Sequence, residues 1–310
     1  MSKDNVRVLY TAFICATLIG VTLWFFFLAT RDVEPEQKQR EISVILYDAG
    51  NGGWQSLEEG IRQAEDDFAV NINLVTMREG ADGDEQTAMI HREIENGAEG
   101  ILLAVWDYQA IYDALSEKEF KVPVITVESG LKETFFPLIS ADNYAMGNSL
   151  GEEILKDLRR KEEPVVAIVQ DGAKRDSVEQ RYQGLFDALE GKAKVLSVKE
   201  GEQPAGVDAF AALHKEALLK LSEQEKSEVN RARVYGIGNT TLIVEALEQG
   251  EITKLVFQNE FNMGYLGIEM LLQELEGKKQ KESREIDYFC VSREEIYGTQ
   301  YEQLLFPIVE

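Results

Sequence analysis

Short apolar runs alternate along the chain with segments whose apolar residues recur every three or four positions. The first run, 42–47, predicts a buried strand that leads into a glycine-rich loop, 48–54. A helix with one buried face follows, because apolar residues are spaced by four, three and four: Leu57, Ile61, Ala64 and Phe68. Ligands of such strand-loop-helix units bind beyond the carboxyl ends of the strands, so we expect Asn51 and Trp54 of the loop in any recognition site.

The same alternation continues to the C-terminus. Further apolar runs predict strands at 70–77, 100–105, 122–127, 139–140, 165–169, 195–198, 232–237 and 252–257. Helical spacing falls between them, at 84–97, 146–158 and 178–189 and after Thr240 and Asn262. The segment 207–221 fits either a strand, 208–213, followed by a helix, or one continuous helix, and we favour the first. The preceding connection, 199–206, is short for a parallel crossover, which needs roughly a dozen residues.

Strands that alternate with helices predict parallel sheets with right-handed crossovers. The strand-loop-helix unit at the start is echoed by the segment 165–189. The pattern therefore predicts an α/β protein with two doubly wound lobes that face each other across a cleft.

The N-terminal segment is of another kind. Residues 8–30 carry no charge over 23 positions, and as a helix they would span about 34 Å, enough to cross a bilayer. We expect a transmembrane anchor here, with 1–7 on the cytoplasmic side and 31–40 as a charged linker. A signal peptide cleaved after Ala29 or Thr30 is the alternative.

Composition narrows the range of functions. The chain has 310 residues, 44% of them apolar, and a net charge of −24, which repels nucleic acids and anionic lipids. Its two cysteines, Cys15 and Cys290, do not form a disulfide framework, and His91 and His214 do not suggest a metal site. No Gly-x-Gly-x-x-Gly spacing, phosphate loop or Ser-His-Asp arrangement is present, so we expect neither catalysis nor a cofactor.

Several stretches resemble those of the type I periplasmic sugar-binding proteins, such as ribose- and galactose-binding proteins, and of the effector domains of the lactose-repressor group. They are the opening unit with Asn51 and Trp54, VPVITVESG followed by ISADNYAMG, EQRYQG, YGIGNTTLIVEALEQG and FQNEFNMGYLG. The resemblance covers about 42–291. It implies two lobes joined by three hinge strands that close on a sugar. On this basis we assign 41–143 with 258–290 to the N-terminal lobe and 144–257 with 291–310 to the C-terminal lobe.

The resemblance also implies a set of ligand-binding residues. In this sequence they are Asn51, Trp54, Glu128, Asp142, Arg181, His214, Asn239, Gln258 and Asn259. The residue types suit a sugar, since amides both donate and accept, a tryptophan offers a flat apolar face, and an arginine has five donors.

Four features of the sequence depart from the pattern of these relatives. Gly53 replaces one of two aromatic residues, Ser129 stands where ribose-binding relatives have arginine, His214 stands near an asparagine position, and neither Gly238 nor Asn239 supplies a common carboxylate. These departures predict a ligand other than ribose itself.

The sequence thus predicts a membrane-tethered, extracytoplasmic receptor for a monosaccharide or polyol. Its partner would be the permease of an ATP-driven (ABC) sugar importer or a sensor histidine kinase. A degenerate binding-protein fold that acts as a protein-interaction module is the alternative, and a nucleotide-dependent enzyme is a remote one. A repressor is excluded, because its DNA-binding domain would have to lie where the apolar segment 8–30 lies.

Overall fold

A computed structural model describes residues 13–14, 16–26, 39–47, 53–116, 122–131, 136–170, 174–223, 232–278, 283–298, 301 and 304–305. The chain falls into two units, Met1–Gln39 and Arg40–Glu310. In the first unit, residues 13–14 and 16–26 are helical. Among the described residues, none of the helices combines the length and apolar character that a membrane span needs. The rest of the predicted anchor, at 8–12, 15 and 27–30, and most of the predicted linker lie outside the described residues.

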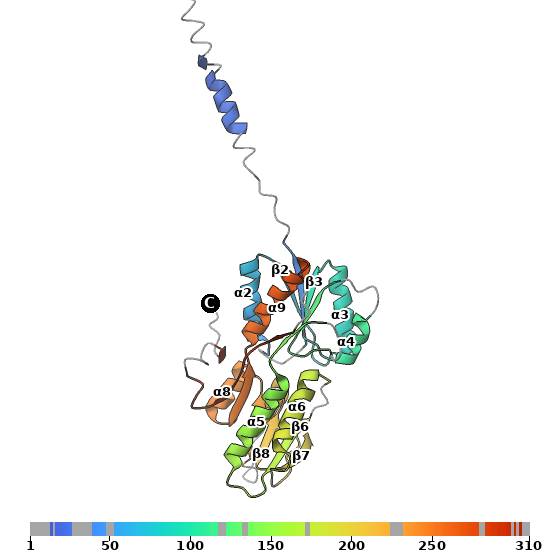
Figure 1. Ribbon diagram of the computed structural model, residues 1–310, viewed down its shortest axis with the longest axis vertical. Coiled ribbons are helices and arrows are strands. Elements are labelled where there is room, and N and C mark those ends of the chain that lie inside the picture. Colours follow the sequence, from blue (N-terminus) through green and yellow to red (C-terminus); the bar gives the residue numbers. More distant parts are fainter. Residues whose placement is uncertain are drawn as a thin grey trace, which may run out of the picture. The chain divides into compact units, whose positions relative to one another are not determined.

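The second unit contains two six-stranded sheets. The first sheet has the order β11-β5-β4-β3-β1-β2 and is parallel throughout. Its strands are β1 (Glu41–Leu46), β2 (Asn71–Thr76), β3 (Gly100–Leu103), β4 (Val124–Val127), β5 (Leu138–Ser140) and β11 (Arg284–Glu285). Helices α2 (Gln55–Phe68) and α9 (Glu260–Leu275) cover one face, and α3 (Gly83–Glu95) and α4 (Tyr108–Leu115) cover the other (Figure 1).

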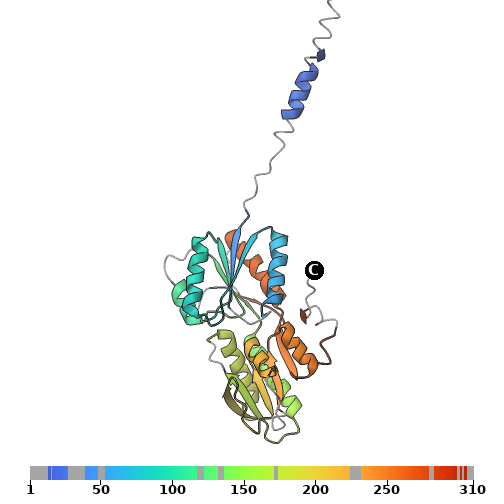
Figure 2. The same cartoon turned by 180° about the vertical axis from the view of Figure 1, so that it is seen from behind.

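The second sheet has the order β12-β10-β9-β8-β6-β7, and only β12 runs antiparallel to its neighbour among the described strands. Its strands are β6 (Val165–Gln170), β7 (Lys194–Lys199), β8 (Ala209–Ala212), β9 (Arg233–Ile237), β10 (Lys254–Gln258) and β12 (Tyr288–Ser292). Its helices are α5 (Asn143–Leu158), α6 (Asp176–Leu189), α7 (Lys215–Ser222) and α8 (Thr241–Gln249). Seen from behind, each sheet and its helices form one lobe, and the two lobes lie one above the other (Figure 2).

Neighbouring residues of β9 show how the helices divide between the two faces of this sheet. Tyr235 donates its hydroxyl to Asp157 of α5 at 3.0 Å, whereas the Cα of Gly236 lies against Leu218 of α7. Successive residues of a strand point to opposite faces, so α5 and α7 lie on opposite sides of the sheet.

Glycines bring two pairs of helices into backbone contact. A Cβ at Gly147 of α5 would lie 2.0 Å from the carbonyl oxygen of Arg181 on α6, and one at Gly184 would lie 2.0 Å from that of Tyr144. A Cβ at Gly60 would meet the carbonyl oxygen of Phe261 at 2.0 Å in the same way, where α2 packs on α9. The contact between α5 and α6 matters for the site, because it fixes the backbone of Arg181 beside the start of α5.

The chain passes between the lobes at three adjacent places. They are 141–142, 258–259 and 286–287, and they are hydrogen bonded to one another: Ala141 N donates to Gln258 Oε1 at 3.3 Å, and Asn259 N to Asp287 O at 3.0 Å. Strand β12 belongs to the second sheet, so the last passage comes before the lobe boundary expected at residue 290.

The α/β fold with two doubly wound lobes, predicted from the pattern, is confirmed. The segment 207–221 is a strand followed by a helix, as favoured, since β8 ends at Ala212 and α7 begins at Lys215. All of 200–208 is described and contains no helix, so the crossover from β7 to β8 has lost the helix that such a connection usually carries.

Candidate ligand-binding site

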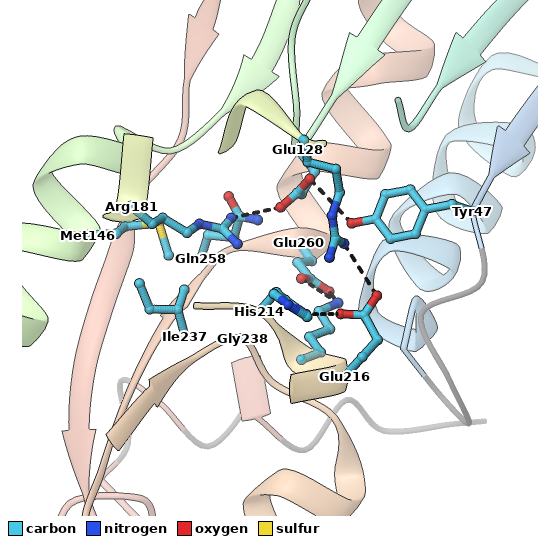
Figure 3. Close-up of a pocket in the computed structure, with 12 residues that line it drawn as sticks. Tyr47, Glu128, Met146, Arg181, His214, Glu216, Ile237, Gly238, Gln258 and Glu260 are labelled. Atoms are coloured by element: carbon cyan, nitrogen blue, oxygen red, sulfur yellow. Dashed lines mark hydrogen bonds and ion pairs between the residues drawn. The ribbon is translucent and has the colours of Figure 1, made fainter. Parts of the chain in front are cut away.

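Polar side chains from both lobes converge on one cavity where the carboxyl ends of the two sheets meet (Figure 3). Its lining residues are Tyr47, Glu128, Met146, Arg175, Arg181, His214, Lys215, Glu216, Ile237, Gly238, Gln258 and Glu260. The space left between these side chains measures about 10 Å³, about the room that one water molecule needs. The side chains of the protein itself therefore fill this part of the cleft.

Glu128 stands at the centre of the lining. It follows β4 directly and adopts a φ of 64°, a conformation that few residues other than glycine accept. This turn aims its buried carboxylate at the second lobe, where Ser177 Oγ donates to Oε1 at 3.0 Å and Arg181 Nη2 donates at 2.8 Å. Backbone strain of this kind, of about 1–3 kcal/mol, concentrates at functional sites.

Arg181 joins three parts of the fold. In addition to its ion pair with Glu128, its Nε donates to Asn143 Oδ1 at 2.8 Å and its Nη1 donates to the carbonyl oxygen of Leu213 at 3.1 Å. Both members of the ion pair are buried. A buried, fully hydrogen-bonded pair of this kind links the first lobe, through Glu128, to α6 of the second.

A second ion pair crosses between the lobes at Lys215. Its ammonium contacts both carboxylate oxygens of Glu260, at 2.6 and 2.7 Å, and also donates to the carbonyl oxygen of Gly53. It lies 4.7 Å from the ring centroid of Trp54, within the range of a cation–π contact. Gly238 makes room for this lysine, because a Cβ there would lie 2.5 Å from Lys215 Cγ.

A third group surrounds Arg175, the residue just before α6. Its guanidinium carbon lies 4.7 Å from the ring centroid of Tyr47 and 5.3 Å from that of Trp106, so it rests against two aromatic rings of the first lobe. Its Nη1 donates to Glu216 Oε1 at 3.3 Å. The other carboxylate oxygen of Glu216 lies 2.6 Å from His214 Nδ1, which therefore carries the proton of that hydrogen bond.

Burial and neighbouring charges shift the pKa values of several of these groups. Burial raises the pKa of Tyr47 well above its ordinary value. Burial alone would also raise the pKa of Glu216, but Arg175 and His214 outweigh it and hold that pKa far below its usual range. Burial raises the pKa of Glu260, and Lys215 offsets only part of this effect.

The structure places four of the residues expected from the sequence in the lining of the cavity: Glu128, Arg181, His214 and Gln258. Four others lie outside that lining. Trp54 is 4% exposed, donates Nε1 to the carbonyl oxygen of Tyr47 at 2.7 Å and packs against the Tyr47 ring. Asn239 is buried just after β9, while Asp142 and Asn259 are the N-caps of α5 and α9. Asn51 lies outside the described residues.

Seven lining residues were not expected from the sequence: Tyr47, Met146, Arg175, Lys215, Glu216, Ile237 and Glu260, whereas Gly238 was the alternative to Asn239 at one expected position. For three of these residues the sequence contains a signal that could have identified them. Lys215 and Glu216 follow the apolar run 209–213 after His214, and Glu260 follows two amide residues, Gln258 and Asn259. All three therefore come shortly after strands. For Arg175 the sequence contains no such signal, because a charged residue before a helix is common on protein surfaces.

The arrangement suits the recognition of a small polar molecule. Buried carboxylates accept hydrogen bonds, the arginines and Lys215 donate them, and Gln258 can do both, while Met146 and Ile237 offer apolar contact. Apart from His214, the lining is balanced in charge, with three cationic residues, Arg175, Arg181 and Lys215, against the carboxylates of Glu128, Glu216 and Glu260.

Known proteins of similar structure are solute-binding proteins and related regulators. A carbohydrate transporter solute-binding protein from Agrobacterium radiobacter, solved with D-arabinose, matches with a TM-score of 0.75 and 21% identity over 87% of this chain and 100% of its own. One from Agrobacterium vitis with bound D-fucose matches at 0.77 and 18%, over 86% and 100%. A protein from Brachyspira murdochii, described as an ABC transporter and LacI family transcriptional regulator, matches at 0.71 and 15%, over 86% and 99%.

The curated proteins contain no significant match. The model of the periplasmic binding protein domain family, in contrast, matches residues 42–215. This match covers more than half of the 310 residues, including both sheets' first strands and the lining from Tyr47 to Lys215. The chain therefore belongs to the periplasmic binding protein domain family, with the type I fold of its sugar-binding members.

Proposed function

We propose that this chain is an extracytoplasmic receptor that binds a monosaccharide or a similar polyol between its two lobes. The observation that carries the proposal is the convergence of buried donors and acceptors from both lobes on one cavity, above all Glu128, Arg181 and Gln258. Hydroxyl groups both donate and accept, so a polyol can pair with all three. The arabinose and fucose bound by two proteins of similar structure support the choice of ligand class.

The roles of individual residues follow from their places. Glu128 accepts from sugar hydroxyls, Arg181 donates from the opposite lobe, His214 sets the position of Glu216, and the amide of Gln258 contacts the ligand beside the lobe passages. In a more open state the residues around the cavity separate. The ligand contacts that we propose for that state are Trp54, Asn51, Asp142, Asn239 and Asn259. No catalytic step, metal or cofactor is part of the proposal.

Tethering and partners complete the proposal. The uncharged segment 8–30 would hold the receptor in the cell membrane by a single span, with the body on the outer side. A tethered receptor can deliver its ligand to the permease of an ABC importer or report it to a sensor histidine kinase. Because several proteins of similar structure are described as parts of ABC transporters, we favour the permease.

One observation favours a second candidate function. The protein's own side chains leave about 10 Å³ in the cavity, far too little for a monosaccharide. A binding-protein fold that no longer binds a ligand and serves as a protein-interaction module would have the same filled cavity. The two candidates differ in whether any small polar molecule stabilises the folded body.

A thermal-shift screen of residues 40–310 tests the choice. This segment is one compact unit that contains both hydrophobic cores. A ligand of the folded state, at a hundredfold excess over its dissociation constant, stabilises it by about 2.7 kcal/mol. The receptor proposal predicts such a shift with at least one monosaccharide or polyol, and its loss in Gln258→Leu. No shift across pentoses, hexoses, deoxy sugars, sugar acids and polyols would favour the interaction module.

A further inference from the structure

Two donors of the Arg175 guanidinium make no hydrogen bond of good geometry, although Tyr47 also interacts with the group. Arg175 is 2% exposed, and neither its Nε nor its Nη2 has a hydrogen-bond partner within the described part of the chain. These two nitrogens lie on the same edge of the guanidinium, so their N–H bonds run parallel. The third nitrogen, Nη1, is the one that pairs with Glu216.

Another arginine of the same chain shows what this edge binds. Arg78 donates from Nε and Nη2 to the two carboxylate oxygens of Glu85, at 3.0 and 2.7 Å. That pair is a two-point contact between an arginine and a carboxylate, which is stronger and more directional than a single hydrogen bond. Arg175 presents the same edge beside the cavity and without a carboxylate.

Leaving such donors unpaired costs free energy when the group is buried, and the cost is greater when the group is charged. A buried donor without an acceptor costs about 1–3 kcal/mol, and more when the group is charged. Tyr47 and Trp106 hold the plane of the guanidinium from the first lobe, so the edge cannot turn to solvent without losing those ring contacts. The position of Arg175 is therefore explained best by an acceptor that arrives with a ligand.

The charges nearby suit an anionic acceptor. Glu216 serves two cationic partners at once, Arg175 at 3.3 Å and His214 at 2.6 Å. When His214 is protonated, these three residues carry a net charge of +1. Glu128 and Glu260 are each paired with a cation of their own, Arg181 and Lys215. A ligand with one negative charge would neutralise the net charge of +1 around Arg175, whereas a ligand with two negative charges would exceed it.

We propose that the ligand carries a carboxylate, as in an aldonic or uronic acid, and that the Nε–Nη2 edge of Arg175 binds this carboxylate at two points. The inference rests on the proposed sugar-receptor function and names a subclass of its ligands. Arg175 is then the residue that separates sugar acids from the parent sugars, while Glu128 and Gln258 bind hydroxyl groups common to both.

Calorimetric titration with matched pairs tests the proposal: D-galactose with D-galacturonate, and D-glucose with D-glucuronate. The full chain is used in a detergent without a sugar headgroup. In at least one pair the acid is expected to bind about tenfold more tightly than its parent, a difference of about 1.4 kcal/mol. Arg175→Lys, which keeps the charge but loses the parallel edge, should abolish the preference of the protein for the acid over its parent sugar.

Two controls keep the test decisive. Arg78→Lys alters the same kind of fork at an exposed site, so it should leave binding of both ligands unchanged. Circular dichroism of each variant shows whether it is folded. If the parent sugar binds as tightly as its acid in every pair that binds, the carboxylate proposal is wrong and the receptor function stands. A preference for a 6-phosphate over both also contradicts it. If a folded protein binds neither member of any pair, nor any other sugar, both proposals fail.

Discussion

Glu128 and Arg181 show how two single residues tie the lobes together. Both are buried, and the carboxylate accepts from Arg181 at 2.8 Å and from Ser177 at 3.0 Å. An ion pair of this kind is costly to desolvate, and removing one member leaves the other charged and unpaired. The pair therefore holds the two lobes in position, even though the cost of desolvating it offsets part of its contribution to the free energy of unfolding.

We predict that Arg181→Met lowers the free energy of unfolding by about 3–5 kcal/mol, because Glu128 would remain buried without its cation. Urea unfolding of residues 40–310 measures this loss. The matched control is Arg62→Met, whose exposed ion pair with Glu59 is expected to contribute less than about 1 kcal/mol. Adding Glu128→Gln to Arg181→Met should recover part of the loss. Equal effects of the two arginine substitutions would contradict this account of the pair.

The partners of Glu216 also predict a dependence on pH. Arg175 and His214 hold the pKa of Glu216 below its ordinary value of 4.5, so its stabilising effect is full above that value and is lost as the pH falls. The stability difference between the protein and Glu216→Gln should therefore shrink between about pH 6 and about pH 3. Urea unfolding at each pH measures the difference.

Glu260 supplies the opposite case. Its pKa is raised by burial, so the folded protein takes up this proton at a higher pH than the unfolded chain does. Stability contributed by Glu260 rises as the pH falls, and the difference between the protein and Glu260→Gln should move in the opposite direction to that of Glu216→Gln. Parallel trends in the two variants would refute the assignment of the two shifts.

At the level of elements, the contact between α5 and α6 places the arginine of the site. Gly147 and Gly184 let the two backbones approach so closely that a Cβ on either would lie 2.0 Å from a carbonyl oxygen. Because Arg181 supplies one of those oxygens, its backbone is held by the helix contact and its side chain extends toward Glu128.

Gly184→Ala should force α5 and α6 apart. We expect a loss of about 3 kcal/mol in the free energy of unfolding, since the new methyl group would meet backbone atoms that cannot rotate away. Any ligand identified by the screen should also bind more weakly, because Arg181 moves with α6. Glu152→Ala, on the exposed side of α5, is the control and should leave both quantities nearly unchanged. An unaltered melting temperature in Gly184→Ala would be incompatible with the packing described here.

The elements themselves could be predicted from the sequence, and the site only in part. Buried parallel strands are almost entirely apolar, as in 42–47, where Ser43 is the exception, and in 100–105. Their helices show a regular apolar stripe, so both patterns are visible locally. Glu128 and Arg181 were found because they lie within stretches that resemble sugar-binding proteins. Arg175, Lys215 and Glu260 come together only through packing of residues far apart in sequence, which no local pattern records.

Trp54 shows a further limit of sequence reasoning. Its place in the opening loop predicted a platform for a sugar, but in the structure Lys215 covers one face of the ring and Tyr47 packs against it. A lysine that follows β8, more than a hundred residues later, takes this place because Gly238 leaves space for its side chain. Neither fact can be inferred from the loop that contains Trp54.

For the whole second unit, the filled cavity has a direct consequence. A monosaccharide cannot enter a space of about 10 Å³, so the lobes must separate before a ligand binds. The three adjacent passages between the lobes, at 141–142, 258–259 and 286–287, are the place where such a motion would bend the chain. Hinge closure around a ligand is a common motion of two-lobed binding proteins.

Small-angle X-ray scattering of residues 40–310, with and without a ligand from the screen, tests this account most directly. We predict that without ligand the radius of gyration is larger than that calculated for the closed arrangement described here, and that a saturating monosaccharide or sugar acid reduces it to the closed value. Identical scattering with and without every compound in the screen, matching the closed arrangement, would contradict a receptor that opens to bind and closes on its ligand.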